Sequence, residues 1–237
     1  MTLARRLASE ALGTALLLAM VVGSAIMADR LAGANAALAL FANSIASATG
    51  LAALILAFGT ISGAHFNPVV TLSEAWQGGM KWRETLAYMA AQFAGAFAGV
   101  AAAHAMFGEP ILSSATLARS GPSLWWSEFL ATFGLIVIIS GCTRGRPTLT
   151  PFAVPAYIAS AYWFTASSSF ANPALTLARA ASSTVAGIRL QDVSGYVAAQ
   201  LLGAVTATVV FTWLHSPAKS REPVQAGGPA FKPALPP

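Results

Sequence analysis

The chain has 237 residues, of which 56% are hydrophobic and only 9% are charged, and its mean hydropathy is +0.66. This composition excludes an ordinary water-soluble domain and is typical of an integral membrane protein. The net charge of +5 is not gathered into a basic stripe with interleaved aromatic residues, so we expect no nucleic-acid partner.

Six apolar stretches are each long enough to span a bilayer, which needs about 17 to 25 residues in a helix. In chain order they cover residues 7–27, 38–59, 83–106, 124–142, 148–166 and 192–214. The runs are continuously apolar and contain Gly, Ala and Ser throughout, whereas barrel strands alternate between lipid-facing and lumen-facing residues. We therefore expect an all-α membrane protein with six transmembrane helices.

Two Asn-Pro pairs interrupt this pattern, at Asn67-Pro68 and Asn172-Pro173. Asn is a preferred helix N-cap and Pro is favoured at the first helical position, so each pair predicts the start of a helix. The first such helix would end at Gly78, after about ten residues or about 15 Å, which is half the thickness of the hydrocarbon core. We therefore expect two re-entrant half-helices in addition to the six spans.

The chain also repeats itself internally. Ser9–Thr14 returns as Ser127–Thr132, and Tyr88–Gln92 returns as Tyr196–Gln200. Each unit holds three spans and one half-helix, so the second copy must enter the membrane upside down, and inverted repeats with broken helices are a transport architecture. The echo also argues against a cleaved secretory signal at the first span.

We expect one transmembrane channel domain over residues 1–216, with repeat one at about 4–107 and repeat two at about 122–215. The segment 217–237 is rich in Pro and Gly and lacks a periodic apolar face, which predicts a disordered cytoplasmic tail. Cys142 is the single cysteine, so no intrachain disulfide is expected.

The distribution of Lys and Arg predicts the orientation. If both termini are cytoplasmic, nine of these residues lie inside and four lie outside. The inner set is Arg5, Arg6, Lys81, Arg83, Arg144, Arg146, Lys219, Arg221 and Lys232, and the outer set is Arg30, Arg119, Arg179 and Arg189. We expect a multi-pass protein of the plasma (inner) membrane, and the preference for Arg over Lys and the short loops favour a bacterial source.

Paired Asn-Pro-Ala-type motifs within an inverted repeat, over about residues 4–214, resemble the aquaporin or major intrinsic protein family. The resemblance implies a homotetramer embedded in membrane lipid, in which each bundle has its own narrow passive pore and the two half-helices meet at the bilayer centre. It also implies that the amides of Asn67 and Asn172 donate hydrogen bonds to the permeant. The pore-midplane positions are then Asn67, Pro68, Val69, Asn172, Pro173 and Ala174.

The irregular backbone and the half-helix ends at the bilayer centre are constrained by the membrane itself. Irregular backbone at 60–66 and 166–171 must be packed in protein or line a wet cavity, where its carbonyls can accept hydrogen bonds. Each half-helix has an effective charge of about +0.5 at its N-terminus. Two such ends at the midplane oppose cations, so we expect protons and ions to be excluded and neutral solutes to pass.

Several intramembrane polar residues have two interpretations. Glu10 and Glu128 either bind coupling ions in a carrier or accept hydrogen bonds from the backbone of a loop, and their symmetric placement favours the second. Gln92 and Gln200 are expected to be structural groups that form interhelical hydrogen bonds. For His65, lining of the pore and bracing of the loop are both open.

The family resemblance also predicts a selectivity filter, and here the chain departs from the usual pattern. Leu175 follows the second motif where most members have Arg. By the family spacing the other filter positions are Ser169, Ser160 and Ser47, which together make a wide ring without a fixed cation. Arg179, four residues further along the same helix face, either leans back into the vacated space or extends to the outer surface.

A wide, uncharged filter predicts passage of glycerol-like polyols and of neutral metalloid hydroxides such as arsenite. The second motif also resembles a bacterial aquaglyceroporin-like subgroup associated with arsenic resistance. A water-selective aquaporin is the first alternative, and an ion-coupled secondary transporter is an alternative of another class. We find no Ser/His/Asp constellation, metal cluster or phosphate loop, so we expect no enzyme, no metal and no cofactor.

Overall fold

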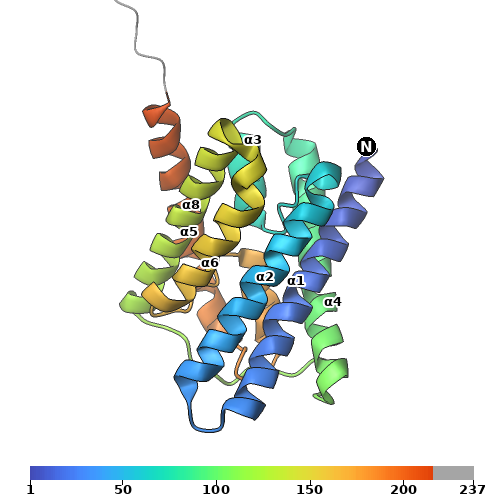
Figure 1. The fold of residues 1–237 in the computed structure, drawn as a ribbon, viewed down its shortest axis with the longest axis vertical. Helices are drawn as coiled ribbons and strands as arrows, with labels where there is room; N and C mark the ends of the chain where they lie inside the picture. The colour runs from blue at the N-terminus through green and yellow to red at the C-terminus, as the bar shows by residue number, and fades with distance from the viewer. Residues whose placement is uncertain (216–237) are drawn as a thin grey trace, which may run out of the picture.

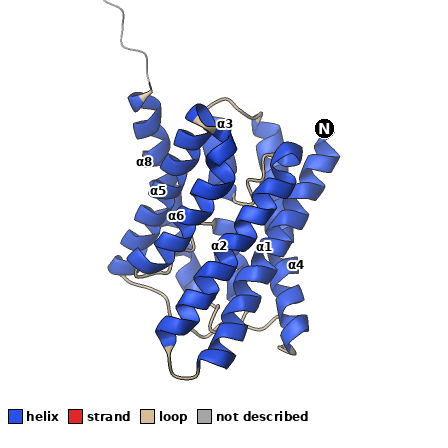
Figure 2. Cartoon of the chain, in the orientation of Figure 1, coloured by secondary structure: helices blue, strands red, loops and turns tan. Residues whose placement is uncertain are grey.

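The computed structural model describes residues 1–215, so the tail predicted at 217–237 lies outside the described residues. All regular structure in the described part is helical, as Figure 2 shows. The α-helices are α1 (Leu3–Ala32), α2 (Ala36–Ser62), α3 (Pro68–Trp76), α4 (Trp82–Phe107), α5 (Pro122–Gly145), α6 (Thr150–Phe164), α7 (Pro173–Ala178) and α8 (Leu190–Leu214). Two 3₁₀ turns, η1 (Pro147–Leu149) and η2 (Arg179–Ala181), precede α6 and follow α7.

Five of the six expected spans, namely α1, α2, α4, α5 and α8, are long and apolar enough to cross a membrane. The sixth, α6, is shorter than the predicted stretch 148–166. It has 15 residues and rises about 22 Å. Its first turn contains a proline, and Thr165 in an extended conformation ends it. With α3 and α7 as the half-helices, the structure confirms an all-helical architecture, with five long apolar helices, the shorter α6 and two half-helices in the described residues.

The helices pack as two equivalent groups. The helix α1 packs against α4 and α2, while α5 packs against α8 and α6, and α6 also lies along α2. A Cβ atom on Gly95 of α4 would overlap the carbonyl oxygen of Ala11, and one on Gly203 of α8 would overlap that of Phe129. Glycine at these two equivalent positions therefore sets how closely the long helices approach.

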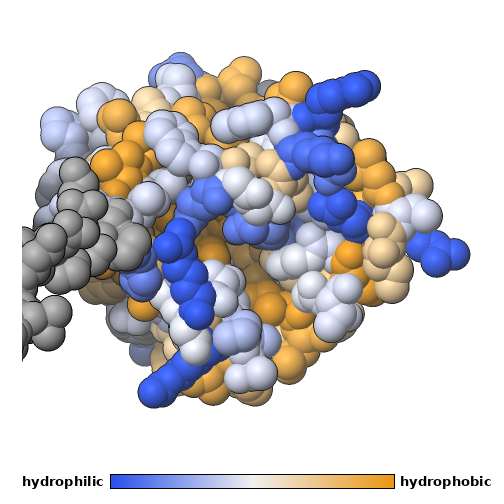
Figure 3. Space-filling view, turned by 90° about the horizontal axis from the view of Figure 1, so that it is seen from above, coloured by the Kyte–Doolittle hydropathy of each residue, from blue (hydrophilic) through white to orange (hydrophobic). Residues whose placement is uncertain are grey.

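The first residue and the end of α8 lie at the same end of the bundle, at the top of Figure 1. We call this the α3 end, because α3 runs from the middle of the bundle towards it. The opposite end, which holds the loops that follow α4 and α7, is called the α7 end. Figure 3 looks onto the α3 end and shows hydrophilic residues around a hollow with hydrophobic surface inside it.

Candidate functional site

The two half-helices begin at asparagines that cap them. Asn67 Oδ1 accepts a hydrogen bond from the N–H of Val69 at 3.1 Å, and Asn172 Oδ1 accepts one from the N–H of Ala174 at 3.0 Å. Both asparagines are extended and a proline follows each one inside the helix, as the Asn-Pro pairs predict. Because each side-chain oxygen is used by its own cap, only the amide N–H groups are left for other partners.

Those amides join the two half-helices end to end. Asn67 Nδ2 donates to the carbonyl oxygen of Ala171 at 2.8 Å, and Asn172 Nδ2 donates to that of Phe66 at 2.9 Å. Each bond therefore reaches the residue that precedes the other asparagine. An amide nitrogen has two hydrogens, so each asparagine keeps a second N–H donor beyond this bond. We call this pair of reciprocal bonds the junction.

The backbone leading into each half-helix is in an unusual conformation. Ala64 and Phe66 have φ of 51° and 49°, and Ser169 and Ala171 at the equivalent positions have φ of 51° and 46°. Left-handed backbone in residues other than glycine costs about 1–3 kcal/mol at each position and persists only where the surroundings hold it. Two buried glutamates hold these loops in place by accepting hydrogen bonds from their backbone N–H groups.

Glu10 of α1 holds the first loop and is fully buried. Its Oε1 accepts from the N–H of His65 at 3.0 Å and from Ser62 Oγ at 2.7 Å. Its Oε2 accepts from the N–H of Phe66 at 2.7 Å and from Gln92 Nε2 at 2.8 Å. The carboxylate therefore takes up the backbone donors that the irregular loop leaves without helical partners.

Glu128 of α5 does the same for the second loop. It accepts from the N–H of Phe170 at 2.8 Å, from the N–H of Ala171 at 2.9 Å and from Gln200 Nε2 at 2.6 Å. Gln200 also donates to Thr176 Oγ1 at 2.9 Å, which ties α8 to the half-helix. Glu128, like Glu10, does not line the cavity described next.

A cavity of about 450 Å³ opens at the α3 end and passes the junction. Its wall combines aliphatic residues with polar ones along its length. At the α3 end it is lined by His65, Glu74, Gln77, Thr143 and Arg144; at the junction by Phe66, Asn67, Ala171 and Asn172; and towards the α7 end by Ser47, Tyr162, Ser169, Phe170 and Leu175. Both junction asparagines thus face the cavity, where their remaining N–H groups can meet a solute.

His65 combines the two roles left open by the sequence. Its backbone N–H is held by Glu10, its Nδ1 lies 3.1 Å from Thr71 Oγ1, and the residue lines the cavity. Of the six expected midplane positions, the asparagines line the cavity, but four others are buried beside it and do not. These four are Pro68, Val69, Pro173 and Ala174, so the bulk of Val69 does not narrow the cavity.

The cavity lining towards the α7 end lacks one of the predicted filter positions, Ser160. Tyr162 donates a hydrogen bond to Ser47 Oγ at 3.1 Å, and both side chains are buried and line the cavity. Ser169 and Leu175 lie there as predicted. Ser169 Oγ is buried and makes no hydrogen bond within residues 1–215.

Ser160 is not part of this region. The cavity-facing row of α6 is spaced four residues apart and ends at Ile158 and Tyr162, whereas Ser160 is exposed on the face that also presents Phe152 and Trp163. Tyr162 therefore takes the place expected for Ser160. The sequence pattern that could have indicated Tyr162 is its i, i+4 spacing from Ile158, which places both residues on one face of α6.

Arg179 takes neither of the two positions expected from the sequence. Its side chain is buried and does not line the cavity. Its Nε donates to the carbonyl oxygen of Ala186, and its Cζ lies 3.5 Å from the centre of the Phe170 ring. The guanidinium group therefore packs on the ring of Phe170, which is itself a lining residue.

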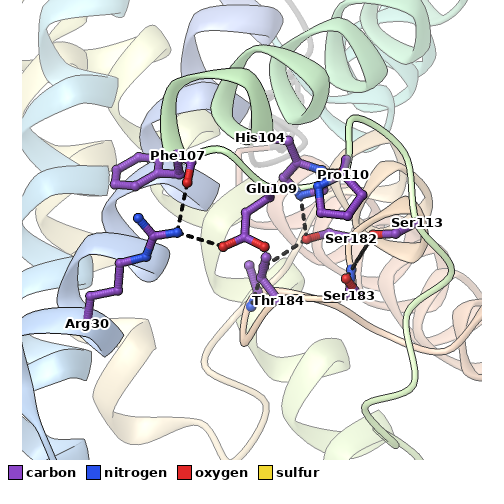
Figure 4. A network of polar contacts seen from close by, with 10 residues as sticks. Arg30, His104, Phe107, Glu109, Pro110, Ser113, Ser182, Ser183 and Thr184 are labelled. Atoms are coloured by element: carbon purple, nitrogen blue, oxygen red, sulfur yellow. Dashed lines mark hydrogen bonds and ion pairs between the residues drawn. The ribbon is translucent and has the colours of Figure 1, made fainter.

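The loops at the α7 end are fastened by a network that Figure 4 shows. The His104 ring is fully buried, with Nδ1 2.7 Å from the carbonyl oxygen of Pro110 and Nε2 2.8 Å from Ser182 Oγ. Arg30 adds an ion pair to Glu109 at 2.7 Å. His104 thus ties the loop after α4 to the loop after η2, a role that its isolated position in the sequence did not indicate.

The chain matches the model of the family described as "Major intrinsic protein" over residues 1–163. It is 51% identical over 217 residues to the aquaglyceroporin AqpS of Rhizobium meliloti (strain 1021), a match that covers 92% of this chain and 93% of the relative. It is 30% identical over 243 residues to the probable aquaporin AqpM of Archaeoglobus fulgidus, covering 90% and 98% of the two chains.

Among solved structures, the fold is similar to that of the aquaglyceroporin from Plasmodium falciparum. The TM-score is 0.64 at 18% sequence identity, and the match covers 90% of this chain and 95% of the other. At this identity the likeness bears on the fold alone. With the family match and the relative at 51% identity, these findings show that the chain belongs to the major intrinsic protein family of membrane channels.

Proposed function

We propose that the chain is a passive transmembrane channel for small uncharged solutes with hydroxyl groups, such as glycerol-like polyols and neutral metalloid hydroxides such as arsenite. The observation that carries this proposal is the junction of Asn67 and Asn172, which faces a continuous cavity with two free N–H donors. The name of the relative at 51% identity, an aquaglyceroporin, supports it.

The lining towards the α7 end supports hydroxylated neutral solutes. Ser47, Tyr162 and Ser169 offer hydroxyl groups, while Leu175 offers an apolar surface, and none of these lining side chains is charged. A solute with hydroxyl groups exchanges its water for these partners, whereas an ion loses a hydration shell that uncharged groups replace poorly.

We also propose that protons and ions are excluded. The positive N-terminal ends of α3 and of α7 with its following turn η2 meet at the junction, and each opposes a cation there. A coupling-ion site is disfavoured because both Glu10 and Glu128 are occupied by loop donors away from the cavity.

We place the α3 end in the cytoplasm of a bacterial inner membrane, because more Lys and Arg flank the spans at that end. We propose a single domain with inverted repeats at about 4–107 and 122–215, supported by the equivalent bonds of the two loops. A homotetramer is proposed from the family resemblance.

The test is solute flux into vesicles that contain the purified full-length chain. Stopped-flow light scattering compares glycerol with water, and an uptake assay follows arsenite. We expect all three to exceed protein-free vesicles, with no dependence on an ion gradient. Movement of water alone would favour the water-selective alternative, and saturable flux driven by an ion gradient would favour a carrier.

Tyr162 and Ser160, both on α6, give a matched pair of substitutions that tests which of them belongs to the filter. Tyr162→Phe removes a hydroxyl group from the cavity lining, and loss of one hydrogen bond of about 1 kcal/mol to the solute should lower glycerol permeability about fivefold relative to water. Ser160→Ala changes an exposed side chain and should leave the ratio unchanged. The reverse pattern would overturn the assignment of Tyr162 to the filter.

A further inference from the structure

The two half-helices differ in charge at one equivalent position. Glu74 lies seven residues after Asn67, and Arg179 lies seven residues after Asn172. Glu74 lines the cavity towards the α3 end, whereas Arg179 is buried against the Phe170 ring towards the α7 end. The repeat that makes the backbones equivalent therefore places opposite charges at the two ends of the cavity.

Arg179 is not alone beside the Phe170 ring. The Cζ atom of Arg119, from the loop after α4, lies 5.3 Å from the centre of the same ring. Arg119 Nε donates to the carbonyl oxygen of Gly187 at 2.8 Å, and Arg179 Nε donates to that of Ala186. Within residues 1–215 neither guanidinium group forms an ion pair with a carboxylate.

The carboxylates of this region do not cancel these charges. Asp192 is paired with Arg189, whose Nε lies 2.9 Å from its Oδ2. Glu128 is held by the loop donors and Gln200. The guanidinium groups of Arg119 and Arg179 thus stand against the single carboxylate of Glu128, which leaves an excess positive charge next to the lining residue Phe170. An ionisable group kept inside a membrane at this cost is by default a candidate for function.

We propose that Arg179, assisted by Arg119, forms a cation barrier at the α7 end by acting through the wall of the cavity without touching the permeant. Phe170 is the lining residue that both guanidinium groups approach, and neither guanidinium group lines the cavity itself. A buried unit charge repels a cation several ångströms away in protein. The repulsion energy corresponds to at least a tenfold fall in the rate of cation passage. A neutral solute carries no net charge and crosses unaffected. The inference rests on the proposed channel function.

The experiment uses the full-length chain in vesicles and measures three quantities: glycerol flux, potassium leak and the ratio of potassium to chloride permeability. Arg179→Met is expected to raise potassium leak and the ratio about tenfold while glycerol flux stays within about twofold. Arg179→Lys keeps the charge and should keep both values near the wild type. Glu74→Gln removes the opposite charge at the equivalent position and should not raise potassium leak.

Arg119→Met serves as a second variant if Arg179→Met does not fold, with glycerol flux as the check on folding. We expect a rise in potassium leak smaller than that of Arg179→Met, about threefold, because Arg119 lies further from the ring. An unchanged potassium-to-chloride ratio in a variant that still passes glycerol would overturn the inference. So would an equal rise in Arg179→Lys, which would indicate packing and not charge. A wild-type chain that passes no glycerol would instead refute the proposed function.

Discussion

Glu128→Gln tests whether the buried carboxylates hold the re-entrant loops. The wild-type side chain accepts three donors with two oxygens: the N–H of Phe170 on one, and the N–H of Ala171 with Gln200 on the other. An amide has one oxygen, so at least one backbone N–H is left buried against an NH₂ group. Losing one charge-assisted bond and stranding one donor cost together about 3–5 kcal/mol.

For a chain of this size, such a loss lowers the thermal midpoint by about 10 °C. The assay is thermal unfolding of the purified protein in detergent, followed by circular dichroism. Glu109→Gln is the matched control, because it breaks a partly exposed ion pair with Arg30 that is worth at most about 1 kcal/mol. Equal midpoints for Glu128→Gln and Glu109→Gln would show that the carboxylate does not stabilise the loop.

Two further changes test the packing and the loops. Gly95→Ala should lower the thermal midpoint through an overpacking cost of about 1–3 kcal/mol, whereas Gly59→Ala, with open space around it, should leave it unchanged or raise it. Similar midpoints would contradict close helix contact at Gly95. His104→Ala removes the bond to Ser182 and should speed amide hydrogen exchange in the loops at the α7 end, and unchanged exchange would mean that His104 does not fasten them.

The starts of both half-helices were predictable because capping is local. Asn67 and Asn172 determine their own surroundings through bonds to residues two positions away, and each is followed by a proline at the position where a helix favours it. The polar partners were harder to assign. The sequence showed that Glu10 recurs as Glu128 but not which backbone groups each would meet.

Ser160 and Arg179 show where counting along the chain fails. The count from Asn172 back to Ser160 crosses residues 165–171, where Ser168, Ser169 and Ala171 are left-handed. Helical phase is not carried through such a loop. The face of α6 that meets the cavity therefore follows from the i, i+4 row within α6 itself, which ends at Ile158 and Tyr162. Arg179 was misplaced because its guanidinium group packs on the Phe170 ring, a contact that the spacing along the sequence does not indicate.

The repeat separates the residues that hold the fold from those that select solutes. Both loops present backbone donors in the same left-handed turns, so both copies need the same acceptors, and the Glu and Gln positions are identical in the two halves. The side chain two residues before each capping asparagine is under no such constraint: His65 in one half corresponds to Phe170 in the other. The two ends of the cavity meet different loops, so the residue type at equivalent positions can change without disturbing the junction. This is why one repeat has Arg179 where the other has Glu74, although the backbones of the two half-helices are equivalent.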